Sequence, residues 1–175
     1  NRNDIEVVIS DNYSDDGTWE YIQKFKSEII VTRPVEPCTP FENHLNSLSK
    51  ARGEYIYPIG GDDIFNKSSF DEVIPLLNNN KIVIGQIRCF DDSNGESIIL
   101  TLTENEISKL FINNKFSLKR LLHFVNYDQL LYSFVPRKSQ KFLFYLKPNT
   151  VEAFGTWTSI FNFYGKSLND IIIII

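Results

Sequence analysis

The sequence predicts an α/β fold in which a mainly parallel sheet is flanked by helices. Short apolar runs typical of buried strands alternate with helical patterns through the first half of the chain. Alternation of this kind is typical of parallel strands joined by helices. Two of the apolar runs, residues 5–10 and 54–59, lead into loops rich in aspartate. Ligands of open α/β sheets bind beyond the carboxyl ends of the strands, so these loops are the first candidates for a functional site.

The first half of the chain contains predicted strands that are each followed by a predicted helix. In chain order the elements are strand 5–10, helix 18–26, strand 29–32, helix 41–51, strand 54–59 and helix 69–77. Apolar residues recur at helical spacing in the first two helices, and Gly53 ends the second. Ser69 and Glu72 have the spacing of a capping box, which predicts the start of the third helix.

The second half has a different character. Residues 81–90 and 97–103 are predicted strands, and the polar segment 91–96 between them predicts a hairpin. Residues 116–125 and 151–164 are predicted helices, separated by an aromatic-rich stretch. The five isoleucines at the end of the chain read either as a buried strand or as an exposed end.

Length and charge limit the function classes. A chain of 175 residues suits one domain with a sizeable core. The net charge of -4 argues against nucleic-acid binding, which needs a concentrated basic surface. Cys38 and Cys89 lack metal-ligand or redox spacing, which favours buried thiols in a reducing compartment. No run shows the pattern of a signal peptide or a spanning segment, so we expect a cytoplasmic protein.

The loop after the third predicted strand has the stronger signal for chemistry. Gly60 and Gly61 allow close backbone approach, and the adjacent carboxylates of Asp62 and Asp63 follow them. Adjacent side chains of an extended segment point in different directions, so one can reach a divalent cation and the other a sugar hydroxyl or a metal-bound water. The alternative is a pair that only shapes the loop, which is the commoner role of adjacent aspartates. The preceding strand and the glycines favour the cation site.

The loop after the first predicted strand carries Asp11 at the strand end. A carboxylate there can accept hydrogen bonds from a base or a ribose. For Asp15 and Asp16 the favoured interpretation is turn and cap chemistry, because Gly17 and Thr18 follow them at the start of a predicted helix. We predict that this loop and the Asp62-Asp63 loop form one site.

Three stretches together resemble family 2 glycosyltransferases of the GT-A fold, whose Rossmann-like sheet is flanked by helices. They are VVISDNYSDDGT at 7–18, ARGEYI at 51–56 and GDD at 61–63. The resemblance implies a single domain over 1–175, with a nucleotide-sugar-binding half at 1–80 and an acceptor-side half of hairpin and helices at 81–175. The family has a strand and a helix before the Asp11 strand, so we expect the chain to be incomplete at its N-terminus.

The resemblance also implies roles for individual residues. Asp11 matches the aspartate that contacts the nucleotide base, and Asn12 lies beside it. Asn43 and Arg52 occupy the helix region where family members line the nucleotide pocket, although a solvated Arg52 is an equal alternative. The metal ligands implied are Asp63 directly and Asp62 toward the ribose or a metal-bound water.

The implied reaction transfers a sugar from a nucleotide diphosphate to an acceptor hydroxyl with inversion. Mg²⁺ or Mn²⁺ neutralises the leaving diphosphate, and a carboxylate acts as general base. Thr156 stands where the family has an acid, which leaves Glu152 and Asp128 as candidate bases. The alternative is that both are ordinary surface carboxylates.

Partners and competing functions follow from the same resemblance. The expected partners are a nucleotide-diphosphate sugar and a saccharide or glycolipid acceptor of bacterial surface polysaccharide synthesis. Through such an acceptor we expect peripheral association with the inner face of the membrane. A non-catalytic nucleotide-sugar-binding relative is the main alternative. A nucleotidyltransferase is a weaker one, because its glycine- and basic-rich triphosphate loop is not found.

Overall fold

The computed structural model describes residues 4–78, 80–90, 93, 95, 97–121, 132–140, 166, 169 and 171–173. These residues fall into two compact units, the first ending at Glu54 and the second starting at Tyr55. Strands and helices alternate in both, which confirms the α/β class. The organisation of the whole chain as one domain with two functional halves stays a prediction.

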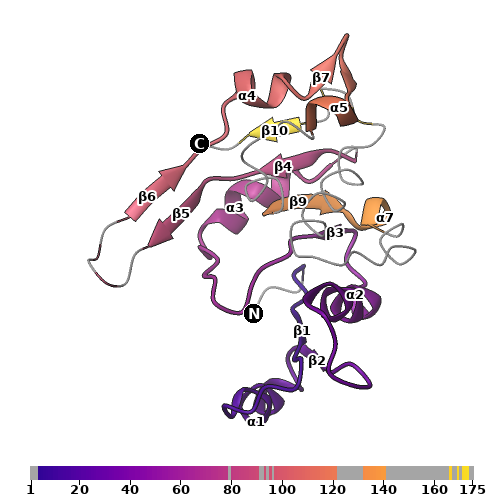
Figure 1. The fold of residues 1–175 in the computed structure, drawn as a ribbon, viewed down its shortest axis with the longest axis vertical. Helices are drawn as coiled ribbons and strands as arrows, with labels where there is room; N and C mark the ends of the chain where they lie inside the picture. The colour runs from indigo at the N-terminus through magenta and orange to yellow at the C-terminus, as the bar shows by residue number, and fades with distance from the viewer. Residues whose placement is uncertain are drawn as a thin grey trace. The chain divides into compact units, whose positions relative to one another are not determined.

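The first unit is a parallel strand pair covered by a helix (Figure 1). Strands β1 (Val8–Ser10) and β2 (Ile30–Thr32) pair in parallel. The connection between them forms α1 (Thr18–Ile22) and the 3-10 turn η1 (Gln23–Phe25). Helix α2 (Pro40–Lys50) packs against β1 and β2. The chain therefore crosses from β1 to β2 and returns through α2, as the sequence predicts.

Helix α2 begins where the sequence supplies a complete cap. Thr39 has extended backbone angles, and its hydroxyl accepts a hydrogen bond from the Glu42 amide at 3.3 Å. The Glu42 carboxylate accepts one from the Thr39 amide at 2.9 Å, which closes a capping box. Pro40 fills the first helical position, where no amide proton is needed. Phe41 and Leu48 are buried, so the apolar face of the helix is the one on the strands.

The second unit is built on a four-stranded sheet in the order β10-β4-β9-β3 (Figure 1). Its strands are β10 (Ile171–Ile173), β4 (Ile82–Ile84), β9 (Ser133–Pro136) and β3 (Tyr55–Ile56). Strands β10 and β4 are parallel, and β9 runs antiparallel to both β4 and β3. The described part of the isoleucine run is therefore a strand. Strand β9 was not predicted. It lies in the aromatic-rich stretch, where the alternation of apolar and polar residues that marks a strand is not visible over four residues.

The two faces of this sheet carry separate parts of the core. Successive side chains of a strand point to opposite faces. Ile82 and Ile84 of β4 pack with one cluster and Val83 with another. The first cluster contains the buried residues Leu102, Ile107, Leu110, Phe111 and Val135. The second contains Val73 and Phe134. The unit thus has a layer on each face of the sheet.

The helix after the Asp62-Asp63 loop starts differently from the prediction. Helix α3 (Ser69–Val73) continues into η2 (Ile74–Leu76), but the predicted capping box of Ser69 and Glu72 is wrong. The residue before the helix, Ser68, already has helical backbone angles and makes no side-chain cap. The amide and hydroxyl of Ser68 both donate to the Asn66 side chain instead. The helix therefore follows directly on a turn that starts at Asn66.

A capping box that the sequence reading missed opens α4 (Glu104–Ser108). Thr103 and Glu106 exchange hydrogen bonds, with the Thr103 amide donating to the Glu106 carboxylate at 2.8 Å. Ile107 of this helix is fully buried against the sheet of the second unit. The helix is only slightly longer than one turn, so it is too short to show the apolar periodicity by which longer helices are predicted.

Two hairpins complete the second unit. Strands β5 (Ile87–Phe90) and β6 (Ser97–Leu100) pair antiparallel, which confirms the predicted hairpin. Cys89 of β5 is exposed and Cys38 is only half-buried, so the expectation of buried thiols is wrong. The predicted strand 81–90 is interrupted, however, because Gly85 and Gln86 separate β4 from β5. The second hairpin, β7 (Phe111–Ile112) and β8 (Lys115–Phe116), was not predicted. Its turn residues, Asn113 and Asn114, have φ of 49° and 61°, a conformation that asparagine tolerates well.

Short helices complete the described part. Helix α5 (Leu118–Leu121) starts after β8, so the helix predicted at 116–125 begins later than expected. Helix α7 (Arg137–Gln140) follows β9 directly. The predicted helix 151–164 lies outside the described residues. Within the residues that were described, no helix is both long and apolar enough to cross a membrane.

Candidate functional site

Asp11 lies at the carboxyl end of β1, where the strand opens into the first acidic loop. It is buried, with 4% of its surface exposed. Arg33, which follows β2, donates from Nε to Asp11 Oδ2 at 2.9 Å and also pairs with it through Nη2. The Ser14 amide donates to the same oxygen at 3.3 Å. No described group donates to the other oxygen, Oδ1, which is a buried acceptor without a partner among the described residues.

Arg33 is held by aromatic rings as well as by the carboxylate. Its guanidinium lies 4.0 Å from the ring centroid of Trp19 and 4.6 Å from that of Tyr13. Tyr13 has a φ of 61°, which is uncommon for an aromatic residue, and its hydroxyl donates to the Val35 carbonyl at 2.7 Å. A backbone in this conformation needs surrounding contacts to hold it. The loop is therefore ordered around the pair of Asp11 and Arg33.

The charge state of Asp11 follows from these contacts. Burial acts to raise the pKa of the Asp11 carboxyl, but the hydrogen bond from Ser14 and the guanidinium of Arg33 lower it more. The net effect places the pKa below that of an ordinary aspartate. At neutral pH Asp11 is therefore an anion, and its free oxygen can only accept a hydrogen bond.

The remaining predicted residues of the first unit are tied into the fold. The Asn12 side chain donates to the Cys38 carbonyl at 2.7 Å and accepts from the Cys38 amide at 3.0 Å. Asn43 bonds the backbone and hydroxyl of Ser10, which fixes α2 to the end of β1. Both asparagines therefore stabilise the fold through these hydrogen bonds. Their roles in binding the nucleotide-sugar donor stay predictions.

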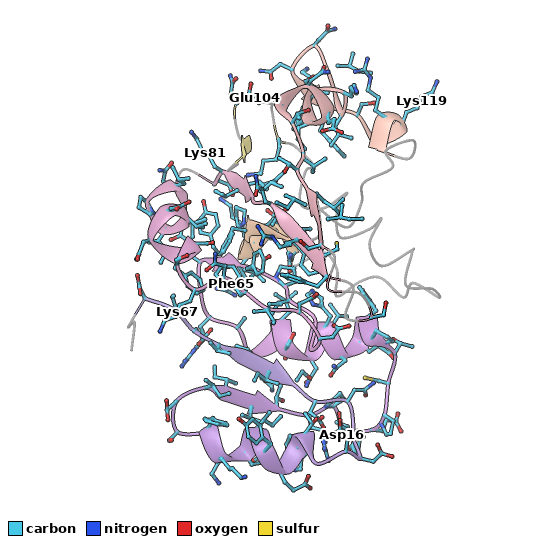
Figure 2. The ribbon with its side chains drawn as sticks, turned by 90° about the vertical axis from the view of Figure 1, so that its left-hand side faces the viewer. Asp16, Phe65, Lys67, Lys81, Glu104 and Lys119 are labelled. Carbon is cyan, nitrogen blue, oxygen red and sulfur yellow. The ribbon has the colours of Figure 1, made fainter. Side chains whose placement is uncertain are left out.

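Arg52 and Asp16 also have local partners. The Arg52 backbone amide and Nε donate to the Glu6 carboxylate, both at 2.7 Å. The Arg52 side chain is 79% exposed, so the solvated alternative fits its surroundings. Asp16, labelled in Figure 2, accepts from the Thr18 amide at 3.0 Å at the start of α1. This hydrogen bond fits the turn-and-cap interpretation of Asp16.

The second acidic loop is a tight turn after β3. The Asp63 amide donates to the Gly60 carbonyl at 3.3 Å. In the reverse direction, the Gly60 amide donates to Asp63 Oδ2 at 3.0 Å. Asp62 and Asp63 are both exposed. The turn therefore folds the carboxylate of Asp63 back over its own backbone and presents it to solvent.

The missing side chain of Gly60 is what lets the two carboxylates converge. A β-carbon built on Gly60 would lie 2.7 Å from Asp63 Oδ2 and 2.8 Å from Asp62 Oδ1. Both oxygens thus face the same small volume beside the glycine. Real β-carbons essentially never approach other atoms this closely. Any side chain at position 60 would force the carboxylates apart.

Tyr132 completes the surroundings of Asp63. Its hydroxyl donates to Asp63 Oδ2 at 2.7 Å, across 69 residues of sequence. Burial, followed by the hydrogen bond to Asp63 and the nearby negative charges, raises the pKa of Tyr132. Burial and the charge of Asp63 raise the pKa of Tyr57 to about 12. Both phenols stay protonated at neutral pH. Tyr57 packs with Phe65, labelled in Figure 2, at 5.1 Å between ring centroids.

The structure brings together some of the predicted residues and leaves others untested. Asp62 and Asp63 converge within the second unit. Asp11 belongs to the first unit, so the prediction of one site for both loops stays a prediction. The candidate bases Asp128 and Glu152 lie outside the described residues. Among the described residues, no group of three His, Cys, Asp or Glu side chains is placed to hold a metal ion.

Sequence reasoning missed two residues that contact these loops, Arg33 and Tyr132. Arg33 comes directly after the strand that pairs with β1, and strand-end positions of neighbouring parallel strands meet at one edge. That rule could have found it. Tyr132 precedes a strand that was not predicted, so no sequence signal pointed to it.

The comparison with known families decides the identity. A sequence model of glycosyl transferase family 2 matches residues 1–139. The chain belongs to glycosyl transferase family 2. This match confirms the predicted family, and it extends beyond both acidic loops into β9 and α7.

Individual relatives of this family 2 chain agree with the assignment. Abequosyltransferase RfbV of Salmonella typhimurium is 41% identical over 70 residues, which cover 38% of this chain and 21% of that protein. The crystal structure of S. aureus TarS 1-349 matches with a TM-score of 0.66 at 16% identity, over 98% of this chain and 49% of TarS. The TarS complex with UDP matches with a TM-score of 0.65 at 17% identity, over 99% and 49% of the two chains. These structural matches confirm the GT-A fold, and the chain spans about half of TarS.

Proposed function

We propose that this protein is an inverting glycosyltransferase that moves a sugar from a nucleotide diphosphate to an acceptor hydroxyl. The observation that carries the proposal is the convergence of Asp62 and Asp63 beside Gly60 in a family 2 chain. Two carboxylates held side by side attract a cation, and a cation is what a diphosphate leaving group requires. Abequosyltransferase RfbV transfers a sugar, as its name says, which supports a role in bacterial surface polysaccharide or glycolipid synthesis.

A divalent cation fits the residues present. Mg²⁺ is usually bound by one or two carboxylates together with substrate phosphates rather than by an all-protein cage. Asp63 would be the direct ligand and Asp62 would bind the ribose or a cation-bound water, with the remaining positions left to the diphosphate. When bound, Mg²⁺ or Mn²⁺ supplies Lewis-acid neutralisation of the charge that develops on the leaving diphosphate.

The first acidic loop would bind the nucleotide base. The free oxygen of Asp11 is a buried anion that accepts a hydrogen bond, and a base N–H is the natural donor. Burial away from water strengthens such a bond. The UDP in the TarS complex supports a uridine nucleotide as the first one to test. Asp128 and Glu152 stay the two candidates for the general base, as the family resemblance implies.

Calorimetric titration of the full-length protein with UDP tests the proposal. We expect binding with Mn²⁺ present and much weaker binding with chelator, because the diphosphate and the two carboxylates repel each other without a cation. Other nucleoside diphosphates follow in the same format. An absence of binding by every nucleotide, with and without Mn²⁺, would overturn the proposal.

Substituting Gly60 provides a sharper test of the carboxylate arrangement. We expect Gly60→Ala to weaken Mn²⁺ binding in the presence of UDP by about 10-fold, a loss typical of disturbing the groups around a metal. The fold should hold, since the β-carbon displaces only the flexible ends of two exposed side chains. At a compatible position this exchange even stabilises by about 0.4–1 kcal/mol. Gly61→Ala is the matched control, because its β-carbon would meet nothing within 4 Å.

A further inference from the structure

We propose that Tyr132 is a positioning residue that sets the orientation of the Asp63 carboxylate for cation binding. The inference rests on the proposed function, because it assigns Asp63 the role of direct ligand. The Tyr132 hydroxyl donates to Asp63 Oδ2 at 2.7 Å, and the Gly60 amide donates to the same oxygen at 3.0 Å. No described group donates to Oδ1. Two donors on one oxygen fix the plane of the carboxylate and leave the other oxygen for a ligand.

The sheet of the second unit explains why Tyr132 reaches this turn. Strand β9 pairs antiparallel with β3, with Ile56 opposite Val135. The chain before Val135 therefore runs toward the end of β3 that leads into the Gly60 turn, and Tyr132 lies in this segment. On its other side β9 pairs with β4, with Val83 opposite Phe134. Tyr132 therefore extends from a strand that is held on both edges, whereas Asp63 lies in an exposed turn.

Because β9 is more rigid than the turn, the hydrogen bond from Tyr132 can restrict the rotamers of Asp63. An exposed aspartate samples several rotamers in water, and each cation-binding event would have to select one of them. The Tyr132 phenol, which extends from a paired strand, restricts these rotamers before the cation binds and so lowers the entropic cost of binding. Phe134, on the same strand, packs on Tyr57 with 4.5 Å between the ring centroids. The donor is thus preorganised by the sheet core, as supporting groups around metal ligands usually are.

The test is Tyr132→Phe, which removes one hydroxyl and keeps the ring. Binding of Mn²⁺ is measured with saturating UDP by the electron paramagnetic resonance signal of free Mn²⁺. We expect affinity to fall about 10-fold, the lower end of the range for losing a group that orients a metal ligand. Binding of UDP in chelator and the thermal unfolding midpoint should stay unchanged. A structural role in the core would move the unfolding midpoint instead.

Tyr57→Phe is the matched control. Tyr57 packs on Phe134 of β9 and is affected by the charge of Asp63, but its hydroxyl makes no hydrogen bond in the described part of the chain. We expect its Mn²⁺ affinity to equal that of the unsubstituted protein. If Tyr132→Phe and Tyr57→Phe behave alike, the positioning role is wrong.

Asp63→Ala distinguishes a failure of the positioning role from a failure of the proposed function. Loss of Mn²⁺ binding in Asp63→Ala with unchanged binding in Tyr132→Phe overturns the positioning role and keeps the proposed function. Unchanged binding in both variants overturns the cation site itself, and the positioning role with it.

Discussion

Asp63→Ala is expected to abolish Mn²⁺-dependent binding of UDP while the protein stays folded. Loss of a group that merely orients a ligand costs about 10- to 100-fold in metal affinity, and loss of the direct ligand should exceed that range. Calorimetric titration with Mn²⁺ should therefore give the same weak binding as titration with chelator. The fold should survive, because Asp63 is exposed and its main partner is the phenol of Tyr132.

The control for Asp63→Ala is Glu72→Ala in the first turn of α3. Glu72 is an exposed carboxylate of the same unit, so its removal makes the same change in net charge. Metal-dependent affinity should stay at the level of the unsubstituted protein. If Asp63→Ala retains that affinity as well, the assignment of the cation site to this turn fails.

Asp11→Ala is expected to weaken UDP binding about 10- to 100-fold, with and without the cation. A hydrogen bond to a charged group contributes about 1.5–3 kcal/mol, and about 1.4 kcal/mol corresponds to a factor of ten. The effect should be independent of the cation, since a base contact needs no metal. This independence distinguishes Asp11→Ala from Asp63→Ala in the same titration.

The same substitution should also lower stability. Arg33 would lose the carboxylate that neutralises it, and the cost of leaving such a group without its partner is about 1–3 kcal/mol. Because of this cost, Asp11→Asn is the second variant: it keeps an acceptor oxygen and the side-chain shape. We expect its UDP affinity to lie between those of Asp11→Ala and the unsubstituted protein. The thermal unfolding midpoint confirms that each variant is folded at the assay temperature.

Asp15→Ala is the matched control for Asp11, because Asp15 is an exposed aspartate of the same loop. Its UDP affinity and its stability should both be unchanged. Equal UDP affinity in Asp15→Ala, Asp11→Ala and the unsubstituted protein would remove Asp11 from the nucleotide site.

Features that depend on neighbouring residues could be predicted from the sequence. The helix starting at Pro40 is specified locally by Thr39 and Glu42. The hairpin of β5 and β6 is specified by the polar segment between its strands. The position of Asp11 at the end of a strand follows from the apolar run before it. The predicted cap at Ser69 failed because Ser68, which binds the Asn66 side chain, already has helical backbone angles, so Ser69 lies inside the helix.

The sequence by itself determined the α/β class, the family and the two acidic loops, because short-range patterns of apolar runs, glycines and aspartates encode them. Tertiary structure decided which groups act on those aspartates. Arg33 reaches Asp11 across 22 residues, and Tyr132 reaches Asp63 across 69. Both contacts depend on strand pairing, and the register of a pairing is set by the packing of the whole sheet rather than by the residues nearby. The partners of a functional carboxylate are therefore decided by the fold.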